Sequence, residues 1–298
     1  MNSLRLVIYG MLFGIANIIP GVSGGTMAAS LGFYDELIRS ISNLKRDWEK
    51  SLRFLAPLFL GAVLGLIFFS YSVEFLLKNF PLPTALAFIG LIFGGLPLLI
   101  QSFQKSLQNK KRTLNIGHLL IFALFFGVIV WMSYVNSSDL DSHHLVFNSQ
   151  EIISLILVGM TGAAAMVIPG VSGSLVFMIF GYYYVIIQTL NRFFSGLKSL
   201  DINVLIHSAK FLFSFGVGVL LGIFLMSKLM EYLFEYYPSF TYSGILGLVA
   251  ASPIAVLKNT QALANFNGST DSIPLLIGLV IAGALGYMTY YLGRSSEK

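Results

Sequence analysis

The chain has 298 residues, of which 56% are hydrophobic and only 10% are charged, against roughly 25% charged residues in a typical soluble chain. This composition, with a mean hydropathy of +0.81, excludes soluble enzymes and nucleic-acid-binding domains, because too few polar residues are present to cover a surface in water. The net charge of +5 is expected to lie mainly in cytoplasmic loops, where Lys and Arg set the orientation of membrane helices, and the absence of cysteine excludes a disulfide scaffold.

Eight long apolar stretches follow one another along the chain. They run approximately over residues 4–38, 53–77, 82–103, 116–136, 151–190, 204–230, 240–258 and 272–293. Their length excludes an outer-membrane barrel, whose signal is alternating segments of about ten residues. Six of them have the length of about 20 residues that a membrane-spanning helix needs. We therefore predict an all-α polytopic membrane protein that forms a single integral membrane domain.

The first and fifth stretches are too long for one crossing, and each carries helix breakers in its middle. The first is interrupted by Pro20-Gly21-Val22-Ser23-Gly24-Gly25 and the fifth by Pro169-Gly170-Val171-Ser172-Gly173-Ser174. At an offset of 149, residues 10–34 match residues 159–183 at 11 of 25 positions. Because the first stretch reappears in mid-chain, we expect it to belong to the mature fold and not to a cleaved signal peptide.

A second block of matches follows at an offset of 157. Its pairs are Gly61/Gly218, Gly65/Gly222, Ser70/Ser227, Glu74/Glu231, Pro81/Pro238 and Gly90/Gly247. Chance similarity between two sequences rich in Leu and Gly is the alternative, but an identical run of six residues in phase with a second block favours a true duplication. We predict one repeat over residues 1–136 and another over residues 150–298.

The broken segments decide whether the repeats are parallel or inverted. Segments that cross the membrane give four spans per half and parallel repeats, whereas re-entrant hairpins give three spans and inverted repeats. The distribution of Lys and Arg fits both topologies. Residues 6–19 form a half-helix of about 21 Å, which passes the midplane of a core about 30 Å thick but does not cross it. The chain returns over the same distance from Gly24 to Ile38. We therefore favour two inverted-topology repeats, each with a re-entrant helical hairpin broken at Pro-Gly-Val-Ser-Gly plus about three transmembrane helices.

Broken helices at corresponding positions of two repeats are the best indication in a sequence of a transporter's binding site. Each breaker is followed by the N-terminus of a new half-helix, which offers N–H donors and partial positive charge to an anion. The alternative is a kink needed only for packing, but its duplication favours a function in binding phosphate or carboxylate. The predicted anion-binding residues are Asn17, Gly21, Ser23, Gly24, Gly25, Thr26, Gly170, Ser172, Gly173, Ser174 and Lys228.

Few other ionisable residues accompany the apolar stretches. Glu74 and Glu231 are candidates for ion coupling, because acids within a membrane are functional candidates; their alternative role is a contact with water near Pro81 and Pro238. The remaining residues are expected in structural or solvated places: Asp35, Glu36 and Arg39 closing the first hairpin, His118 and His207 at the interface, and His143 and His144 in a polar loop with Asp139 and Asp141. We predict no metal site and no cofactor.

The doubled motif resembles the PopT family of bacterial membrane proteins, which are implicated as undecaprenyl-phosphate translocases. The resemblance rests on the runs 16–26 and 163–174, followed by Gly32-Phe33-Tyr34 and by Gly181, and it covers essentially the whole chain. In that family a basic residue follows the serine of both second blocks. Here Ser227-Lys228 keeps the pattern, whereas Ser70 is followed by Tyr71. If this basic residue binds phosphate, only the second repeat supplies it.

The resemblance implies that the protein returns undecaprenyl phosphate from the outer to the inner leaflet of the bacterial cytoplasmic membrane, recycling the lipid carrier of peptidoglycan and cell-wall synthesis. The expected partners are this lipid and the surrounding membrane lipids. Two alternatives stay open: a membrane-embedded polyprenyl-pyrophosphate phosphatase and a small-anion transporter. The breakers contain no carboxylate and no histidine to act as a general base, so we predict a transporter and not an enzyme.

Overall fold

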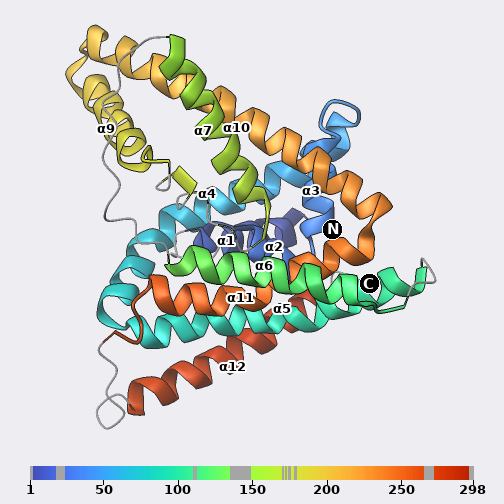
Figure 1. The fold of residues 1–298 in the computed structure, drawn as a ribbon. Coiled ribbons are helices and arrows are strands. Elements are labelled where there is room, and N and C mark those ends of the chain that lie inside the picture. Colours follow the sequence, from blue (N-terminus) through green and yellow to red (C-terminus); the bar gives the residue numbers. More distant parts are fainter. Residues whose placement is uncertain are drawn as a thin grey trace. The chain divides into compact units, whose positions relative to one another are not determined.

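The computed structural model describes residues 3–17, 24–109, 113–134, 149–169, 171, 173, 176–177, 180–264 and 272–294, and these residues are helical apart from short turns (Figure 1). The chain forms two compact units. The first comprises Met1–Tyr134, Ile168–Val171 and Lys228–Lys298, and the second comprises Val135–Val167 and Ser172–Ser227.

Seven helices of the described part are long and apolar enough to cross a membrane. They are α4 (Trp48–Asn79), α5 (Pro81–Asn109), α6 (Ile116–Tyr134), α7 (Ser149–Val167), α10 (Ile202–Tyr236), α11 (Pro238–Asn259) and α12 (Ser272–Arg294). Large apolar side chains on their outer faces, such as Phe59, Phe213 and Leu220, are more than two-thirds exposed, as suits contact with lipid. The prediction of an all-α polytopic membrane protein is confirmed.

The first unit contains a layer of four helices. α6, α11, α5 and α12 lie side by side in this order (Figure 1). Glycines bring the backbones of α5 and α12 into contact: a Cβ added to Gly94 would lie 2.1 Å from the Gly286 carbonyl oxygen. Without a hydrophobic driving force between helices in lipid, such close packing of small residues supplies the association.

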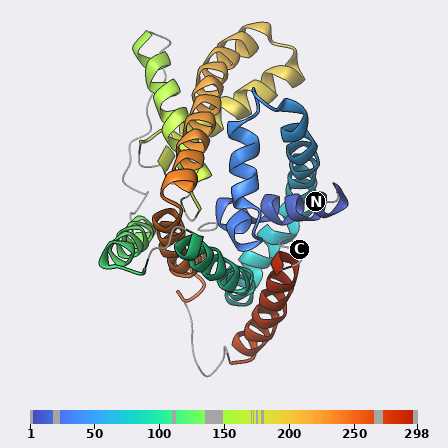
Figure 2. The ribbon, with the colours of Figure 1, turned by 90° about the vertical axis from the view of Figure 1, so that its right-hand side faces the viewer.

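The start of the chain reaches the end of this layer. α1 (Ser3–Ala16) lies close to the end of α12, as the view in Figure 2 shows. The Arg5 guanidinium and the Tyr9 hydroxyl both donate hydrogen bonds to the Leu292 carbonyl oxygen, at 3.0 and 2.8 Å. These bonds also satisfy a carbonyl in the last turn of α12, which has no partner within its own helix.

The contact between α1 and α4 recurs, residue for residue, between α7 and α10. A Cβ on Gly61 or Gly218 would lie 2.1 or 2.2 Å from the carbonyl oxygen of Val7 or Ile156, respectively. These pairs are related by the offsets of 149 and 157 found in the sequence. The turn into the next helix is also shared: the hydroxyls of Thr84 and Thr241 donate to the carbonyls at the preceding helix end. Each half of the chain therefore builds the same helix pair.

The segment that follows the first breaker, expected as one half-helix, contains two helices: α2 (Gly24–Ser30) and α3 (Tyr34–Ser42). Gly32 ends α2 at φ 75°, and the Phe33 N–H donates to the Ala28 carbonyl, which is the hydrogen bond of a Schellman motif. The repeat-related Gly181 has φ 76°. A left-handed residue cannot continue a helix, so this feature, which both repeats share, turns the chain.

His118, expected near a helix end, lies in the first turn of α6 (Ile116–Tyr134). Its side chain is 1% exposed and stacks on Phe240 with 4.2 Å between ring centroids, while Phe103 contacts it edge-on. Ser243 donates a hydrogen bond to the His118 carbonyl oxygen. The start of α6 therefore joins the C-terminal part of α5 to the start of α11.

Candidate functional site

Asn17 connects the end of α1 to the start of α2. Its side-chain amide donates to the Phe13 carbonyl at 2.8 Å, and its side-chain oxygen accepts the Gly24 N–H at 3.2 Å. Both polar ends of the side chain thus bind backbone, and the oxygen satisfies one N–H at the start of α2. Gly21 and Ser23, predicted as ligands, lie outside the described residues.

α2 is enclosed by protein along its whole length. All residues from Gly24 to Ser30 are buried, and Thr26 and Ser30 have no exposed surface. α2 packs between α1 and α5, and a Cβ on Gly95 of α5 would lie 2.2 Å from the Ser30 Cα. α2, the helix that follows the first breaker, is therefore held by protein on both sides.

Gly25, at the end of the first breaker, lies against Pro169, at the start of the second. A Cβ on Gly25 would be 3.1 Å from both the Cα and the N of Pro169. Residues more than 140 positions apart in sequence, each from a repeat-related motif, are therefore neighbours. Gly170, Ser172 and Ser174 lie outside the described residues. Gly173 belongs to the second unit and is buried, with Met166 and Gly162 around it.

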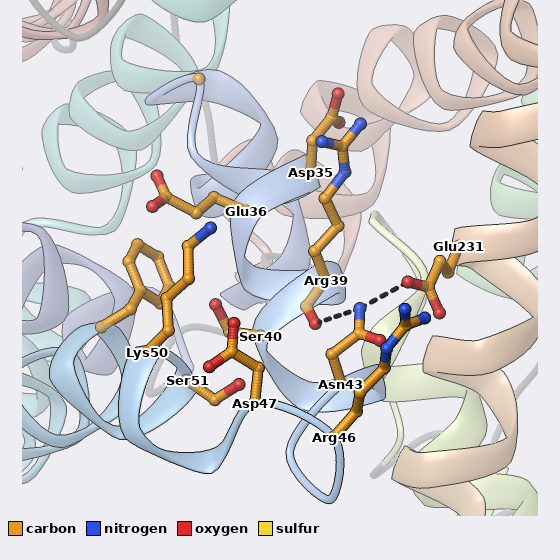
Figure 3. Close-up of a pocket in the computed structure, with 12 residues that line it drawn as sticks. Asp35, Glu36, Arg39, Ser40, Asn43, Arg46, Asp47, Lys50, Ser51 and Glu231 are labelled. Atoms are coloured by element: carbon orange, nitrogen blue, oxygen red, sulfur yellow. Dashed lines mark hydrogen bonds between the residues drawn. The ribbon is translucent and has the colours of Figure 1, made fainter.

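A polar cavity of about 780 Å³, which we call the α3 pocket, opens beside α3 (Figure 3). α3, the following turn and the first turns of α4 form most of it, and α10 adds Glu231. Its charged lining consists of four acids (Asp35, Glu36, Asp47 and Glu231) and three bases (Arg39, Arg46 and Lys50). Sequence reasoning assigned the α3 charges to closing the hairpin and did not predict a pocket, which needs tertiary contacts with α4 and α10.

Lys228 and Glu231, two of the predicted residues, form an ion pair at the edge of this pocket. The Lys228 Nζ is 3.0 Å from Glu231 Oε2, and Asn43 donates a hydrogen bond to Glu231 Oε1 at 2.5 Å. Figure 3 shows the Arg46 guanidinium pointing toward the same carboxylate. Glu74 lies in α4, and its side chain is outside the described part of the structure.

Asp35 is an acid of the α3 pocket that also contacts the interior of the first unit, through α11. The Tyr242 hydroxyl of α11 donates a hydrogen bond to its carboxylate, and the Arg39 guanidinium lies beside it (Figure 3). Burial raises the pKa of Asp35 above its ordinary value, while the Tyr242 hydrogen bond and the Arg39 charge act in the opposite direction. On the far side, Asp35 lines a second cavity of about 180 Å³ with Tyr242 and Ser102.

Comparisons with known proteins indicate the same family as the doubled motif. A family described as VCA0040-like, undecaprenyl phosphate translocase-like, matches residues 13–207 and 197–296. A polyprenyl-phosphate transporter of Staphylococcus aureus (strain NCTC 8325 / PS 47) is 28% identical over 292 residues, covering 95% of this chain and 96% of the relative. One of Vibrio cholerae serotype O1 (strain ATCC 39315 / El Tor Inaba N16961) is 27% identical over 291 residues, with 93% and 85% covered.

No solved structure matches the chain. The family inferred from the doubled motif is nevertheless confirmed, because the family match extends over almost the entire sequence, and the relatives are transporters by name, not enzymes. The chain belongs to the undecaprenyl phosphate translocase-like family.

Proposed function

We propose that this multi-pass membrane protein translocates polyprenyl phosphate from one leaflet of the membrane to the other. The names of its relatives support the lipid substrate, and the membrane helices supply the setting. The observation that carries the proposal is the meeting of the two breakers at Gly25 and Pro169. In the proposed site, the half-helix starts that follow the two breakers supply N–H donors and positive dipole ends, which is what a phosphate headgroup needs when it leaves water.

The headgroup is proposed to bind between the breakers, while the isoprenoid tail stays in lipid. Thr26 and the backbone around Gly24 and Gly25 contribute from α2, where Asn17 fixes the geometry of the helix start. The other proposed ligands are Gly21, Ser23, Gly170, Ser172, Gly173, Ser174 and Lys228. Lys228 has an exposed ammonium group next to Glu231, and it can exchange this carboxylate for phosphate without losing its charge partner.

Inverted repeats with re-entrant hairpins provide the proposed route between leaflets. α5 and α11 are repeat-related through Pro81/Pro238 and Gly90/Gly247. The end of α5 meets the start of α11 at His118, which supports opposite directions for the two helices. α1, at 14 residues, is about 21 Å long, which supports a hairpin that turns back within the membrane. Two inverted halves around a fixed site open alternately to each side.

The proposed setting is the bacterial cytoplasmic membrane. There the protein would return undecaprenyl phosphate from the outer to the inner leaflet for reuse in peptidoglycan and other cell-envelope synthesis. The resemblance of the doubled motif supports this direction, and the basic segment around Arg39, Lys45 and Arg46 supports a cytoplasmic face at the base of the first hairpin.

A reconstituted assay tests the function. Purified protein in vesicles receives polyprenyl phosphate with a fluorescent group on the isoprenoid end, and a membrane-impermeant reductant quenches only the outer leaflet. We expect the protein to make nearly all of the lipid accessible, whereas protein-free vesicles should leave about half protected. The same vesicles should release no inorganic phosphate from polyprenyl pyrophosphate.

Two other results of these assays would contradict lipid translocation and indicate a different function. Steady phosphate release that disappears in a Glu74→Gln or Glu231→Gln variant would identify a phosphatase. Uptake of radiolabelled inorganic phosphate into the vesicles, without movement of the lipid, would identify a small-anion transporter.

A further inference from the structure

Asp35 lies where two cavities of the first unit meet. It lines both the α3 pocket, of about 780 Å³, and the cavity of about 180 Å³ bounded by α5, α11 and α12. On the inner side the Tyr242 hydroxyl donates a hydrogen bond to its carboxylate. On the pocket side the Arg39 guanidinium lies beside it (Figure 3). The carboxyl group can therefore lose its contact with Arg39 on the pocket side and still keep its hydrogen bond from Tyr242 on the inner side.

The α3 pocket is nearly neutral before a ligand enters. Its four acids face three bases, and Lys228 pairs with Glu231 at its edge. A phosphate monoester would add about 1.5 to 2 negative charges and would attract the Arg39 guanidinium, which bonds phosphate well. Asp35 would then lose its neighbouring cation and gain a neighbouring anion, and both changes favour the neutral carboxyl group.

We propose that Asp35 is a proton-binding site, and that its carboxylate takes up a proton when the phosphate headgroup of the lipid occupies the α3 pocket, before it reaches the proposed site between the breakers. The inference rests on the proposed function, since the headgroup is that of the transported lipid. When the headgroup leaves, Arg39 returns to Asp35 and the proton passes to water in the pocket. The coupling is reciprocal, so a bound proton strengthens headgroup binding by the same factor.

The other titratable groups that face Asp35 are less suited to take the proton. α3 contributes Tyr34, Glu36 and Arg39, α11 contributes Tyr242, the turn and α4 contribute Arg46, Asp47 and Lys50, and α10 contributes Glu231. α5 and α12 line the inner cavity with Ser102 and Gly293, which do not titrate. Glu36 and Asp47 are exposed, and Glu231 is bonded to Lys228 and Asn43. Asp35 differs from these acids because it lines both cavities, and desolvation there raises its pKa.

Two measurements on the full chain test the proposal. In weakly buffered detergent solution with a pH dye, polyprenyl phosphate is added to the protein and proton uptake is recorded. In vesicles, lipid movement is followed with and without a pH gradient. We expect the wild type to take up protons on binding and to move lipid several-fold faster with the gradient. Asp35→Asn, which imitates the protonated group, should lose both responses. Glu49→Gln, on the exposed face of α4 and paired with Arg53, should keep both.

The outcomes separate the inference from the function. Lipid movement by the wild type without proton uptake, or proton uptake retained in Asp35→Asn, would overturn the inference and leave the function standing. Absence of lipid movement in the wild type would overturn the function itself. If Asp35→Asn does not fold, Tyr242→Phe decides: loss of a hydrogen bond to the carboxylate should move the pH dependence upward by about one unit. An unchanged pH profile would overturn the proposal.

Discussion

At the scale of single residues, Gly25 is the position where the two breakers touch. A Cβ there would be 3.1 Å from two backbone atoms of Pro169, which is tighter than ordinary van der Waals contact. We expect Gly25→Ala to slow lipid movement a few-fold and Gly25→Val to slow it more than tenfold, because overpacking costs about 1–3 kcal/mol and displaces the second breaker. The measurement is the vesicle assay, with chromatographic homogeneity of each variant as the test of folding.

Gly127 provides the matched control, because a Cβ at this position of α6 meets no atom within 4 Å. Gly127→Val should move lipid at the wild-type rate. A folded Gly25→Val protein with wild-type transport would place the headgroup site away from the contact between the breakers.

At the scale of the helices, α10 carries two glycines with opposite surroundings. A Cβ on Gly218 would lie 2.2 Å from the Ile156 carbonyl of α7, whereas one on Gly216 meets no atom within 4 Å. We expect Gly218→Val to force the two helices apart and to lower the free energy of unfolding by about 1–3 kcal/mol. Gly216→Val should have no such effect. Thermal unfolding in detergent compares the two, and equal unfolding temperatures would contradict the close packing of α7 on α10.

The apolar helices were predicted correctly from the sequence, whereas the points at which some helices end were not. α4, α5, α6, α10, α11 and α12 coincide with six predicted stretches, because hydropathy over about 20 residues is a strong signal. The break at Gly32 was missed, although its match with Gly181 was visible. A glycine at the same position of both repeats indicates a shared feature. That this feature is a left-handed backbone, with φ of about 75°, is seen only in the structure.

At the scale of the whole molecule, the proposed topology places the start of α1 and the turn after α3 on the same side of the membrane. Because the chain has no native cysteine, single cysteines at Leu4, Lys45 and Asn79 can be labelled with an impermeant maleimide. We expect positions 4 and 45 to react from the cytoplasmic side and position 79, at the end of α4, from the other side. Labelling of positions 4 and 45 from opposite sides would show that the first hairpin crosses the membrane.

The candidate site could be predicted only in part, because some of its residues are brought together only by the fold. Helix breakers and their duplication are local patterns, and they pointed to the neighbourhood of Gly25 and Pro169. The place of Asp35 depends instead on Tyr242, more than 200 residues away, and on the wall that α4 and α10 give to the α3 pocket. Such a cluster cannot be recognised from a pattern in one sequence, because its residues come from segments far apart along the chain.

The pairing of α5 with α12 has a consequence for biosynthesis. About 160 residues separate the end of α5 from the start of α12, so at roughly 5–20 residues per second the ribosome needs roughly 8–30 s to supply the partner. Throughout this interval the glycine groove of α5 at Gly90 and Gly94 faces lipid, the insertion machinery or another nascent chain. A message cut short before α12 would leave that groove permanently open, and quality-control proteases that survey the membrane would meet an unfinished protein whose earlier helices are already in place.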